Sequence, residues 1–228
     1  MGINIDAWIN EYQRAVENKF GNRIWFIGLQ GSYGRGEATE QSDIDMVLIL
    51  DNISIEDLKA YSDIFDTLPE RSKACGFISG KEELFSWEPS DLFQFYYDTV
   101  PIKGSLDILL NYIQRDDIRR AIHIGACNVY HICVHNLVHE KSLDILKAIY
   151  KSAVFILQAI AFYETGKYER QKSTLQSLLK PKDQNILQSG IELKEKDQIS
   201  KEEFDKLSEL MLKWASKWIQ RCKKAEYC

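Results

Sequence analysis

The alternation of apolar and polar residues divides the chain into two regions of different character. In the first region, short runs rich in β-branched and aromatic residues predict strands, and apolar residues that recur every three or four positions predict helices. The predicted helices cover residues 5–20, 54–68 and 81–87, and the predicted strands cover residues 24–29, 44–50, 74–79 and 92–100. We therefore expect a small mixed sheet with flanking helices up to about residue 112.

Helical periodicity dominates the second region, where glycine becomes rare. Long helices are predicted over about 116–139, 142–165 and 202–224, with shorter helices near 181. Ser142 is typical of a helix N-cap, and Gly166 is typical of a helix end. The chain is therefore predicted to be an α+β protein, with a small mixed β-sheet domain at 1–112 and an all-α helical bundle domain at 113–228.

Composition and charge narrow the class of protein. The 228 residues are 45% hydrophobic and 28% charged, as in an ordinary globular protein with a sizeable core. The formal net charge is −5, whereas proteins that bind nucleic acids usually carry a basic excess. We therefore expect no stable nucleic-acid partner, and a cationic substrate is slightly favoured.

The N-terminus and the cysteines predict a cytoplasmic protein with no membrane partner. Residues 1–6 do not resemble the start of a signal peptide. Residues 148–163 are apolar but contain Lys151 and Gln158, and a bilayer requires ~20 apolar residues. The five cysteines are odd in number and form no Cys-x-x-Cys motif, which is typical of reduced thiols.

The residues that carry chemistry lie beside two of the predicted strands. Gly31 and Ser32 follow the first strand, and Asp43 and Asp45 lie at the start of the second. Glycine lets backbone N–H groups approach a phosphate closely, and the serine hydroxyl can add a hydrogen bond. Because side chains alternate along a strand, Asp43 and Asp45 share one face, where two carboxylates repel each other unless a cation lies between them. Mg²⁺ suits that position, because it binds one or two carboxylates together with substrate phosphates.

These residues resemble the signature of the DNA polymerase β-type nucleotidyltransferase superfamily, which is Gly-Ser, a gap of ten residues and then Asp-x-Asp. The same gap separates Ser32 from Asp43 in this chain. The order of a small α/β domain and then a helical domain is similar to that of kanamycin nucleotidyltransferase and of minimal nucleotidyltransferases with helical partner domains. The likeness in sequence covers residues 31–50, and beyond them it is one of layout.

The resemblance implies transfer of a nucleoside monophosphate from an NTP to a hydroxyl group, with Mg²⁺ and release of pyrophosphate. ATP is the expected nucleotide. Gly31, Ser32 and Arg35 would bind its triphosphate, and Asp43 and Asp45 would hold the metal and so be catalytic residues.

The acceptor stays open at this point. The expected acceptor is a small hydroxylated molecule such as an antibiotic. Two alternatives are a nucleotidyltransferase that modifies a protein, as in toxin–antitoxin pairs, and a non-catalytic nucleotide-binding regulator. A homodimer is compatible with each of them.

The family normally adds a third carboxylate from a later strand, where it binds the metal that activates the attacking hydroxyl. The predicted strand at residues 74–79 has no carboxylate, and Cys75 or Gly76 takes that place. Asp98, on the fourth predicted strand, is the nearest substitute, and Asp107 is a second candidate. We therefore expect Asp98 to be the third metal ligand and a catalytic residue.

All four histidines lie on the first long helix of the predicted helical domain: His123, His131, His135 and His139. Three interpretations compete. His131 and His135 are one turn apart and could chelate zinc, or the histidines could pack between helices. The third interpretation follows from the resemblance, because kanamycin nucleotidyltransferase has a carboxylate base at about this place. Of the four, we expect His131 to act as a catalytic base, since a histidine can take a hydroxyl proton near neutral pH.

Lys151 interrupts an otherwise apolar stretch at residues 148–157. Its side chain either extends to solvent or binds a nucleotide phosphate. The family often uses a basic residue of the helical domain in this second way. Lys151 is therefore a further candidate for nucleotide binding.

Overall fold

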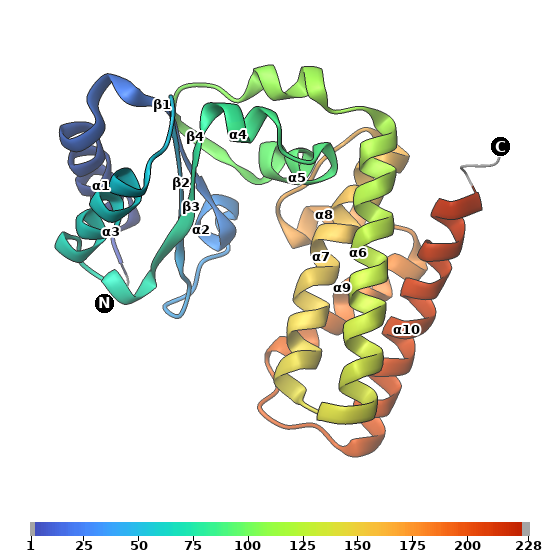
Figure 1. Cartoon of the computed structure of the whole chain (residues 1–228). Helices are drawn as coiled ribbons and strands as arrows, with labels where there is room; N and C mark the ends of the chain where they lie inside the picture. Colours follow the sequence, from blue (N-terminus) through green and yellow to red (C-terminus); the bar gives the residue numbers. More distant parts are fainter. Residues whose placement is uncertain (1–2, 225–228) are drawn as a thin grey trace. The chain divides into compact units, whose positions relative to one another are not determined.

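The computed structural model describes residues 3–224 and divides into two compact units (Figure 1). The first unit extends to Ile113 and holds a four-stranded sheet with helices. The second begins at Gln114, and its described residues form helices and their connections. The predicted α+β class is confirmed.

The elements of the first unit follow the predicted order, except that the predicted turn after β1 contains a short helix and that the last predicted strand is mostly a helix. They are α1 (Ile5–Phe20), η1 (Gly21–Arg23), β1 (Ile24–Gln30), α2 (Gly31–Arg35), β2 (Ile44–Leu50), α3 (Ile55–Thr67), η2 (Arg71–Lys73), β3 (Ala74–Gly80), α4 (Lys81–Phe85), α5 (Pro89–Asp98), β4 (Val100–Lys103) and η3 (Asp107–Tyr112). The side chain of Ser54 accepts a hydrogen bond from the Asp57 amide and so begins α3, as its sequence predicts.

The predicted strand at residues 92–100 is wrong. Residues up to Asp98 form α5, and the strand β4 is confined to Val100–Lys103. The aromatic residues in this stretch favour a strand by propensity. Pro89 in the first turn and the Glu88 side chain, which accepts a hydrogen bond from the Ser90 amide, instead begin a helix.

The sheet has the strand order β3-β2-β1-β4 and is mixed, as predicted. β1 is antiparallel to β2 and β4, and β3 is parallel to β2. The end of β1 therefore lies at the same edge as the starts of the other strands. We call this the site edge, and it contains Gln30, Asp45, Cys75 and Val100.

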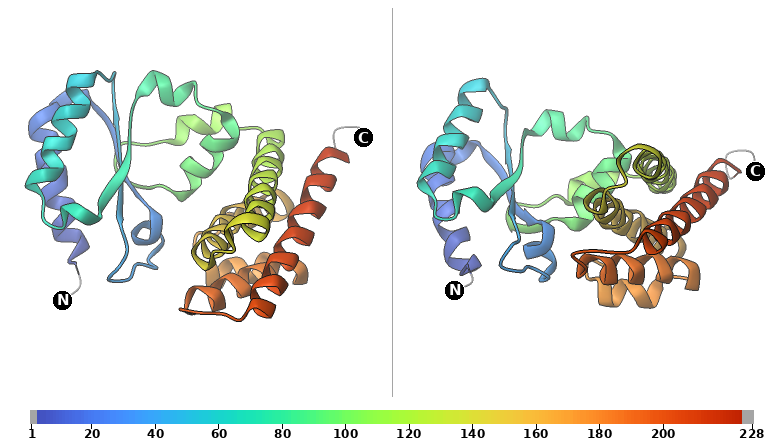
Figure 2. Two further views of the ribbon diagram at one scale, coloured as in Figure 1. Left: turned by 60° about the horizontal axis from the view of Figure 1, so that its bottom comes forward. Right: turned by 90° about the horizontal axis from the view of Figure 1, so that it is seen from below.

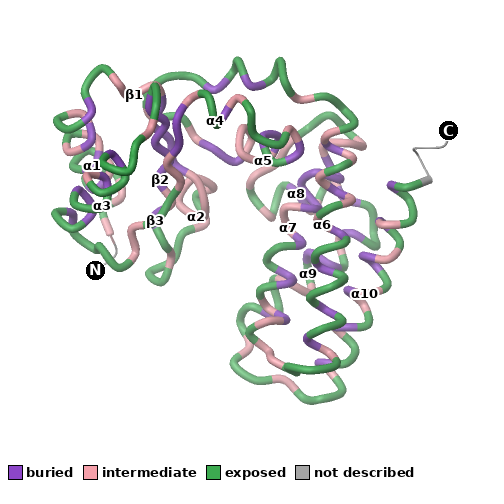
Figure 3. Tube along the Cα trace, viewed as in Figure 1, coloured by how far each residue is buried: buried purple, intermediate pink, exposed green. Residues whose placement is uncertain are grey.

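Helices cover both faces of the sheet (Figures 1 and 2). Ile44, Met46 and Leu48 of β2 pack in one core with residues of α1 and α3, such as Tyr12 and Phe65. The alternate β2 residues Val47 and Ile49 belong to a second core with Leu84 of α4 and Leu92 of α5. Most residues of β1 and β2 are buried (Figure 3). Because side chains alternate, Asp45 lies on the face of Val47 and Ile49.

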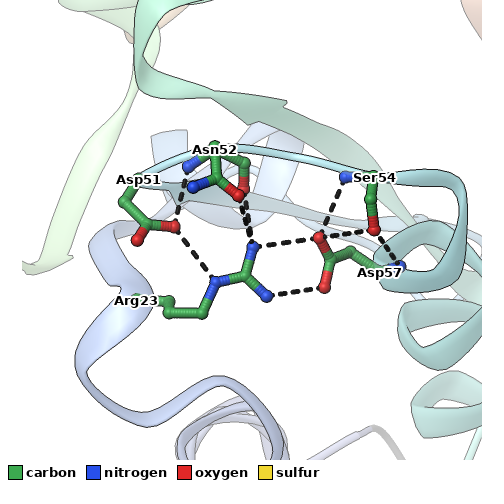
Figure 4. A network of polar contacts seen from close by, with 5 residues as sticks. All are labelled: Arg23, Asp51, Asn52, Ser54 and Asp57. Carbon is green, nitrogen blue, oxygen red and sulfur yellow. Dashed lines mark hydrogen bonds and ion pairs between the residues drawn. The ribbon is translucent and has the colours of Figure 1, made fainter.

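A network of polar contacts stabilises the sheet edge opposite the site edge (Figure 4). Arg23, just before β1, donates to Asp57 Oδ1 at 2.7 Å and to Oδ2 at 3.0 Å, and it donates to Asp51 Oδ1 at 3.1 Å. Asp57 also accepts hydrogen bonds from the amide and the hydroxyl of Ser54. The hydrogen bonds from Arg23 hold the pKa of Asp57 well below its usual range.

The second unit is a bundle of α6 (Arg115–His135), a short π-helical segment η4 (Asn136–Glu140), α7 (Leu143–Thr165), α8 (Lys172–Leu178), α9 (Pro181–Lys194) and α10 (Lys201–Lys224). Ser142 caps α7 and Gly166 ends it with φ +73°, as predicted. By length and composition, α7 is apolar enough to cross a membrane. Its residues Leu146, Ala153 and Leu157 are buried in the centre of the bundle, as in the core helix of a helical protein.

Candidate active site

The glycine–serine turn (Gly31–Arg35, helix α2) follows β1 at the site edge. Gly31 has φ +66°, a conformation that favours glycine. A Cβ atom at this position would lie 1.8 Å from Asp45 Oδ2. The turn backbone and the Asp45 carboxylate are therefore in direct contact, and the structure brings together a predicted phosphate-binding residue and a predicted metal ligand.

Asp43 and Asp45 border the start of β2, where Ile44 between them is fully buried in the core of α1 and α3. Asp43 is exposed, and Asp45 is half-buried. Within β2, the carboxylate of Asp45 lies on the face opposite to Ile44. Two carboxylates beside a turn that can bind phosphate are a donor set that suits Mg²⁺ bound together with a triphosphate.

Cys75 occupies the place next to Asp45 on β3. The parallel register pairs Asp45 with Cys75 and Met46 with Gly76, so Cys75 is the neighbour of Asp45 on β3. Gly76 has φ +147°, and a Cβ atom there would lie 1.9 Å from the Met46 carbonyl oxygen. Within residues 3–224, no three His, Cys, Asp or Glu side chains gather closely enough to hold a metal ion.

Asp98 does not join Asp43 and Asp45 in such a group. It is the last residue of α5, it is buried, and its neighbouring strand β4 lies on the far side of β1 from β2. Arg35 Nη1 lies 3.1 Å from its Oδ2. Asp98 therefore ends a helix and does not lie on a strand as expected, and it is a buried carboxylate that pairs with an arginine. Its role as a metal ligand stays a prediction.

Arg35 is held between two carboxylates. Besides its contact with Asp98, its Nε lies 3.7 Å from Glu37 Oε2, and its side chain is only 13% exposed. The guanidinium charge is therefore balanced within the protein. Its binding to a triphosphate stays a prediction.

Asp107, the second candidate for a third carboxylate, begins η3. Its Oδ1 accepts a hydrogen bond of 3.0 Å from the Tyr96 hydroxyl. Gln30, Glu37 and Thr99 were not predicted as residues of this region. No motif marks them, and only the position of Gln30 next to Gly31 could have indicated its involvement.

The remaining candidates lie in the second unit. His131, His135 and His139 are exposed, so these three are not buried between helices as one interpretation proposed. The rings of His135 and His139 lie 4.9 Å apart. Lys151 is exposed on α7, as a side chain that extends to solvent would be. The catalytic role of His131 and the phosphate contact of Lys151 stay predictions.

A family model for the nucleotidyltransferase domain matches residues 9–106. This range contains the glycine–serine turn, Asp43 and Asp45. The first unit is a nucleotidyltransferase domain. The predicted resemblance to nucleotidyltransferases is thereby confirmed for this domain.

A stretch of this chain is similar to a protein of Methanocaldococcus jannaschii that is provisionally named a protein adenylyltransferase. The two are 43% identical over 49 residues, which are 22% of this chain and 49% of that protein. The match thus spans about half the length of this curated relative.

The nucleotidyltransferase domain and the helical unit together are similar to a solved structure. It is a spectinomycin adenyltransferase from Enterococcus faecialis, crystallised with ATP and spectinomycin. The TM-score is 0.58 over 94% of this chain and 99% of that chain, at 13% sequence identity. At this identity the likeness shows a shared fold.

Proposed function

We propose that this protein transfers an adenylyl group from Mg²⁺-bound ATP to a hydroxyl group of an acceptor and releases pyrophosphate. The contact between Gly31 and Asp45 carries the proposal, because it joins a turn suited to phosphates with a carboxylate suited to the metal. ATP is proposed because both similar proteins are named for adenylyl transfer.

Each residue of the site edge has a separate task in this proposal. Asp43 and Asp45 would hold the metal ion, which when bound offsets the negative charge of the triphosphate and of the leaving pyrophosphate. The N–H groups of Gly31 and Ser32 and the Ser32 hydroxyl donate hydrogen bonds to phosphate oxygens. The acceptor oxygen forms a bond to the α-phosphorus, the bond from the α-phosphorus to the bridging oxygen breaks, and a base takes the hydroxyl proton. His131 is our candidate base, on the family resemblance alone.

A small hydroxylated molecule, such as a cationic antibiotic, is the proposed acceptor. The likeness to the spectinomycin adenyltransferase supports it, because that likeness extends over 94% of the chain and includes the helical unit. The formal net charge of −5 also favours a cationic acceptor.

A protein acceptor is the second candidate. The observation that favours it is the 43% identity to a protein provisionally named a protein adenylyltransferase, although this identity covers only 49 residues. A third candidate, a regulator that binds the nucleotide without transfer, is favoured by Cys75, which stands beside Asp45 where the family places a carboxylate.

Labelled ATP distinguishes these candidates. The purified protein is incubated with Mg²⁺ and ATP labelled at the α-phosphate, together with spectinomycin, other aminocyclitols and aminoglycosides, or a cell extract. Label on a small molecule supports the first proposal, and label on a protein supports the second. ATP binding without pyrophosphate release supports the regulator. If ATP does not bind in the presence of Mg²⁺, the proposed function is wrong.

A further inference from the structure

Two polar contacts hold the two ends of the glycine–serine turn. Gln30, directly before the turn, donates from Nε2 to the Thr99 hydroxyl oxygen at 2.6 Å. Arg35, at the end of the turn, has Nη1 at 3.1 Å from Asp98 Oδ2 and 3.5 Å from Oδ1. Asp98 and Thr99 are neighbours in the sequence, so one dipeptide contacts both ends of the turn.

The Asp98–Thr99 dipeptide is itself fixed by the surrounding structure. Asp98 ends α5, and Val100 begins β4 and pairs with Leu29 of β1. The Thr99 hydroxyl donates to the Phe95 carbonyl oxygen within α5. Thr99 is 2% exposed and Asp98 is 7% exposed. A helix, a strand and burial thus place the dipeptide before any ligand binds.

The charges in this region depend on each other. A carboxylate as buried as Asp98 is stable only when it is paired and hydrogen-bonded. Arg35 is the cation that pairs with it, and Glu37 lies on the other side of the same guanidinium. Removing Arg35 would take a counter-ion away from the buried carboxylate of Asp98. Asp98 and Arg35 therefore hold each other in place.

We propose that Asp98 and Thr99 are positioning residues for the nucleotide, which fix the glycine–serine turn in the conformation that receives the triphosphate. The inference rests on the proposed function. Gly31 adopts φ +66°, and glycine loses more conformational freedom on ordering than other residues. Contacts at both ends order the turn before ATP binds. A smaller part of the binding free energy is then lost to ordering the turn when ATP binds. The effect passes through the turn and not through the metal ion.

ATP binding to Asp98→Asn and Thr99→Val tests the proposal. We expect both variants to bind ATP about tenfold more weakly by calorimetry, with the Mg²⁺ concentration for half-maximal binding unchanged. Thr99→Ser keeps the hydroxyl and should restore wild-type affinity. Asp66→Asn is the matched control, because Asp66 forms an exposed ion pair of 2.8 Å with Arg71 in the same unit. A shift in the Mg²⁺ requirement of Asp98→Asn would instead identify Asp98 as a metal ligand and overturn the proposal.

A double-mutant cycle tests whether Asp98 acts through Arg35. If it does, Asp98→Asn combined with Arg35→Gln should bind ATP no more weakly than the weaker single variant. If the losses of ATP affinity in the two single variants add up in the double variant, Asp98 acts independently of Arg35, contrary to the proposal.

Hydrogen exchange of the free protein separates this inference from the proposed function. In Asp98→Asn and Thr99→Val, amides 31–36 should exchange faster than in the wild type, without any nucleotide present. If Asp98→Asn does not fold, Thr99→Val carries the test, because it leaves the charges unchanged. Wild-type protein that binds no ATP overturns the proposed function and the role in nucleotide binding together. If the wild-type protein binds ATP and the variants match it in ATP affinity and in hydrogen exchange, this inference alone is overturned.

Discussion

Gly31 and Asp45 are in such close contact that a Cβ atom on the glycine would lie 1.8 Å from the aspartate Oδ2. The contact follows from the register of the antiparallel strands β1 and β2, in which Gln30 is paired with Asp45. The turn proposed to bind phosphate and the carboxylate proposed to hold the metal are thus held together by the sheet.

Gly31→Ala should disrupt this contact. The added Cβ atom must displace the Asp45 carboxylate, and we expect Mg²⁺-dependent ATP binding to weaken at least ~10-fold, with a loss of about 1–3 kcal/mol in the free energy of unfolding. Gly21→Ala is the matched control, because Gly21 also has a positive φ, +53°, but an added Cβ atom there would meet no atom within 4 Å. Calorimetry and urea unfolding measure the two effects. If Gly31→Ala bound ATP as well as Gly21→Ala, the contact would have no role in the site.

Asp43→Asn and Asp45→Asn should each lower transfer by at least ~10²-fold, because each removes a charge that the metal requires. Both variants should fold, since removing one of two neighbouring carboxylates relieves their repulsion. Pyrophosphate release with a competent acceptor is the measurement, and Asp66→Asn serves as the control for loss of an exposed carboxylate of the same unit. Turnover close to that of the wild type in either variant would contradict their assignment as metal ligands.

Cys75→Asp should place a third carboxylate beside Asp45, to which Cys75 is paired in the sheet. We expect tighter Mg²⁺ binding in the presence of ATP and faster pyrophosphate release, by about tenfold, because a second metal position gains an anionic ligand. Cys75→Ser should change neither quantity. Cys127→Asp, at an exposed cysteine of the helical unit, controls for the added charge. An unchanged Mg²⁺ affinity in Cys75→Asp would show that this register position does not face the metal.

Acid should remove the stabilisation that Asp57 provides. Its pKa in the folded protein lies below the usual value of 3.8, mainly because of the hydrogen bonds from Arg23. The contribution of Asp57 to the stability of the folded protein is therefore fully present above about pH 5, and it is lost as the pH falls through the pKa that Asp57 has in the folded protein. Asp57→Asn should lower the free energy of unfolding by about 1–2 kcal/mol at pH 7. This value allows for the partial exposure of Arg23, which weakens the ion pair.

Urea unfolding of the wild type and Asp57→Asn at several values between pH 7 and pH 3 measures this dependence. The difference in stability should shrink toward pH 3, because the Asp57 carboxyl group becomes protonated in the unfolded chain while it keeps its charge in the folded protein. Asp66→Asn should show a small difference throughout, since its ion pair is exposed. A difference for Asp57→Asn that stayed constant across this range would contradict the assignment of the lowered pKa to Arg23.

Local signals predicted much of the fold. Ser54 and Ser142 marked the starts of α3 and α7, and Gly166 marked the end of α7, because capping depends on residues within one turn. The buried strand β2 matched its predicted bounds, since residues 44–50 are almost continuously apolar. The glycine–serine turn and the paired aspartates were also predicted, because each lies directly beside a strand.

Contacts between distant parts of the chain were not predictable from such signals. Arg35 and Asp98 are separated by 63 positions, and they meet only because β4 pairs with β1 and α5 is a helix. The aromatic residues of α5 favoured a strand, and that error placed Asp98 on the wrong kind of element. The partner of Asp45 on β3 likewise depended on the exact register, which separates Cys75 from Gly76.

The strand order also has a consequence for how the site assembles during folding. β1 and β2 are neighbours joined by one connection, so the Gly31–Asp45 contact closes a short loop. The pairing of β2 with β3 requires the whole crossover through α3, and contacts of greater sequence separation form more slowly. We therefore expect the nucleotide-binding half of the site to form early, with Cys75 and the Asp98–Thr99 dipeptide joining it later.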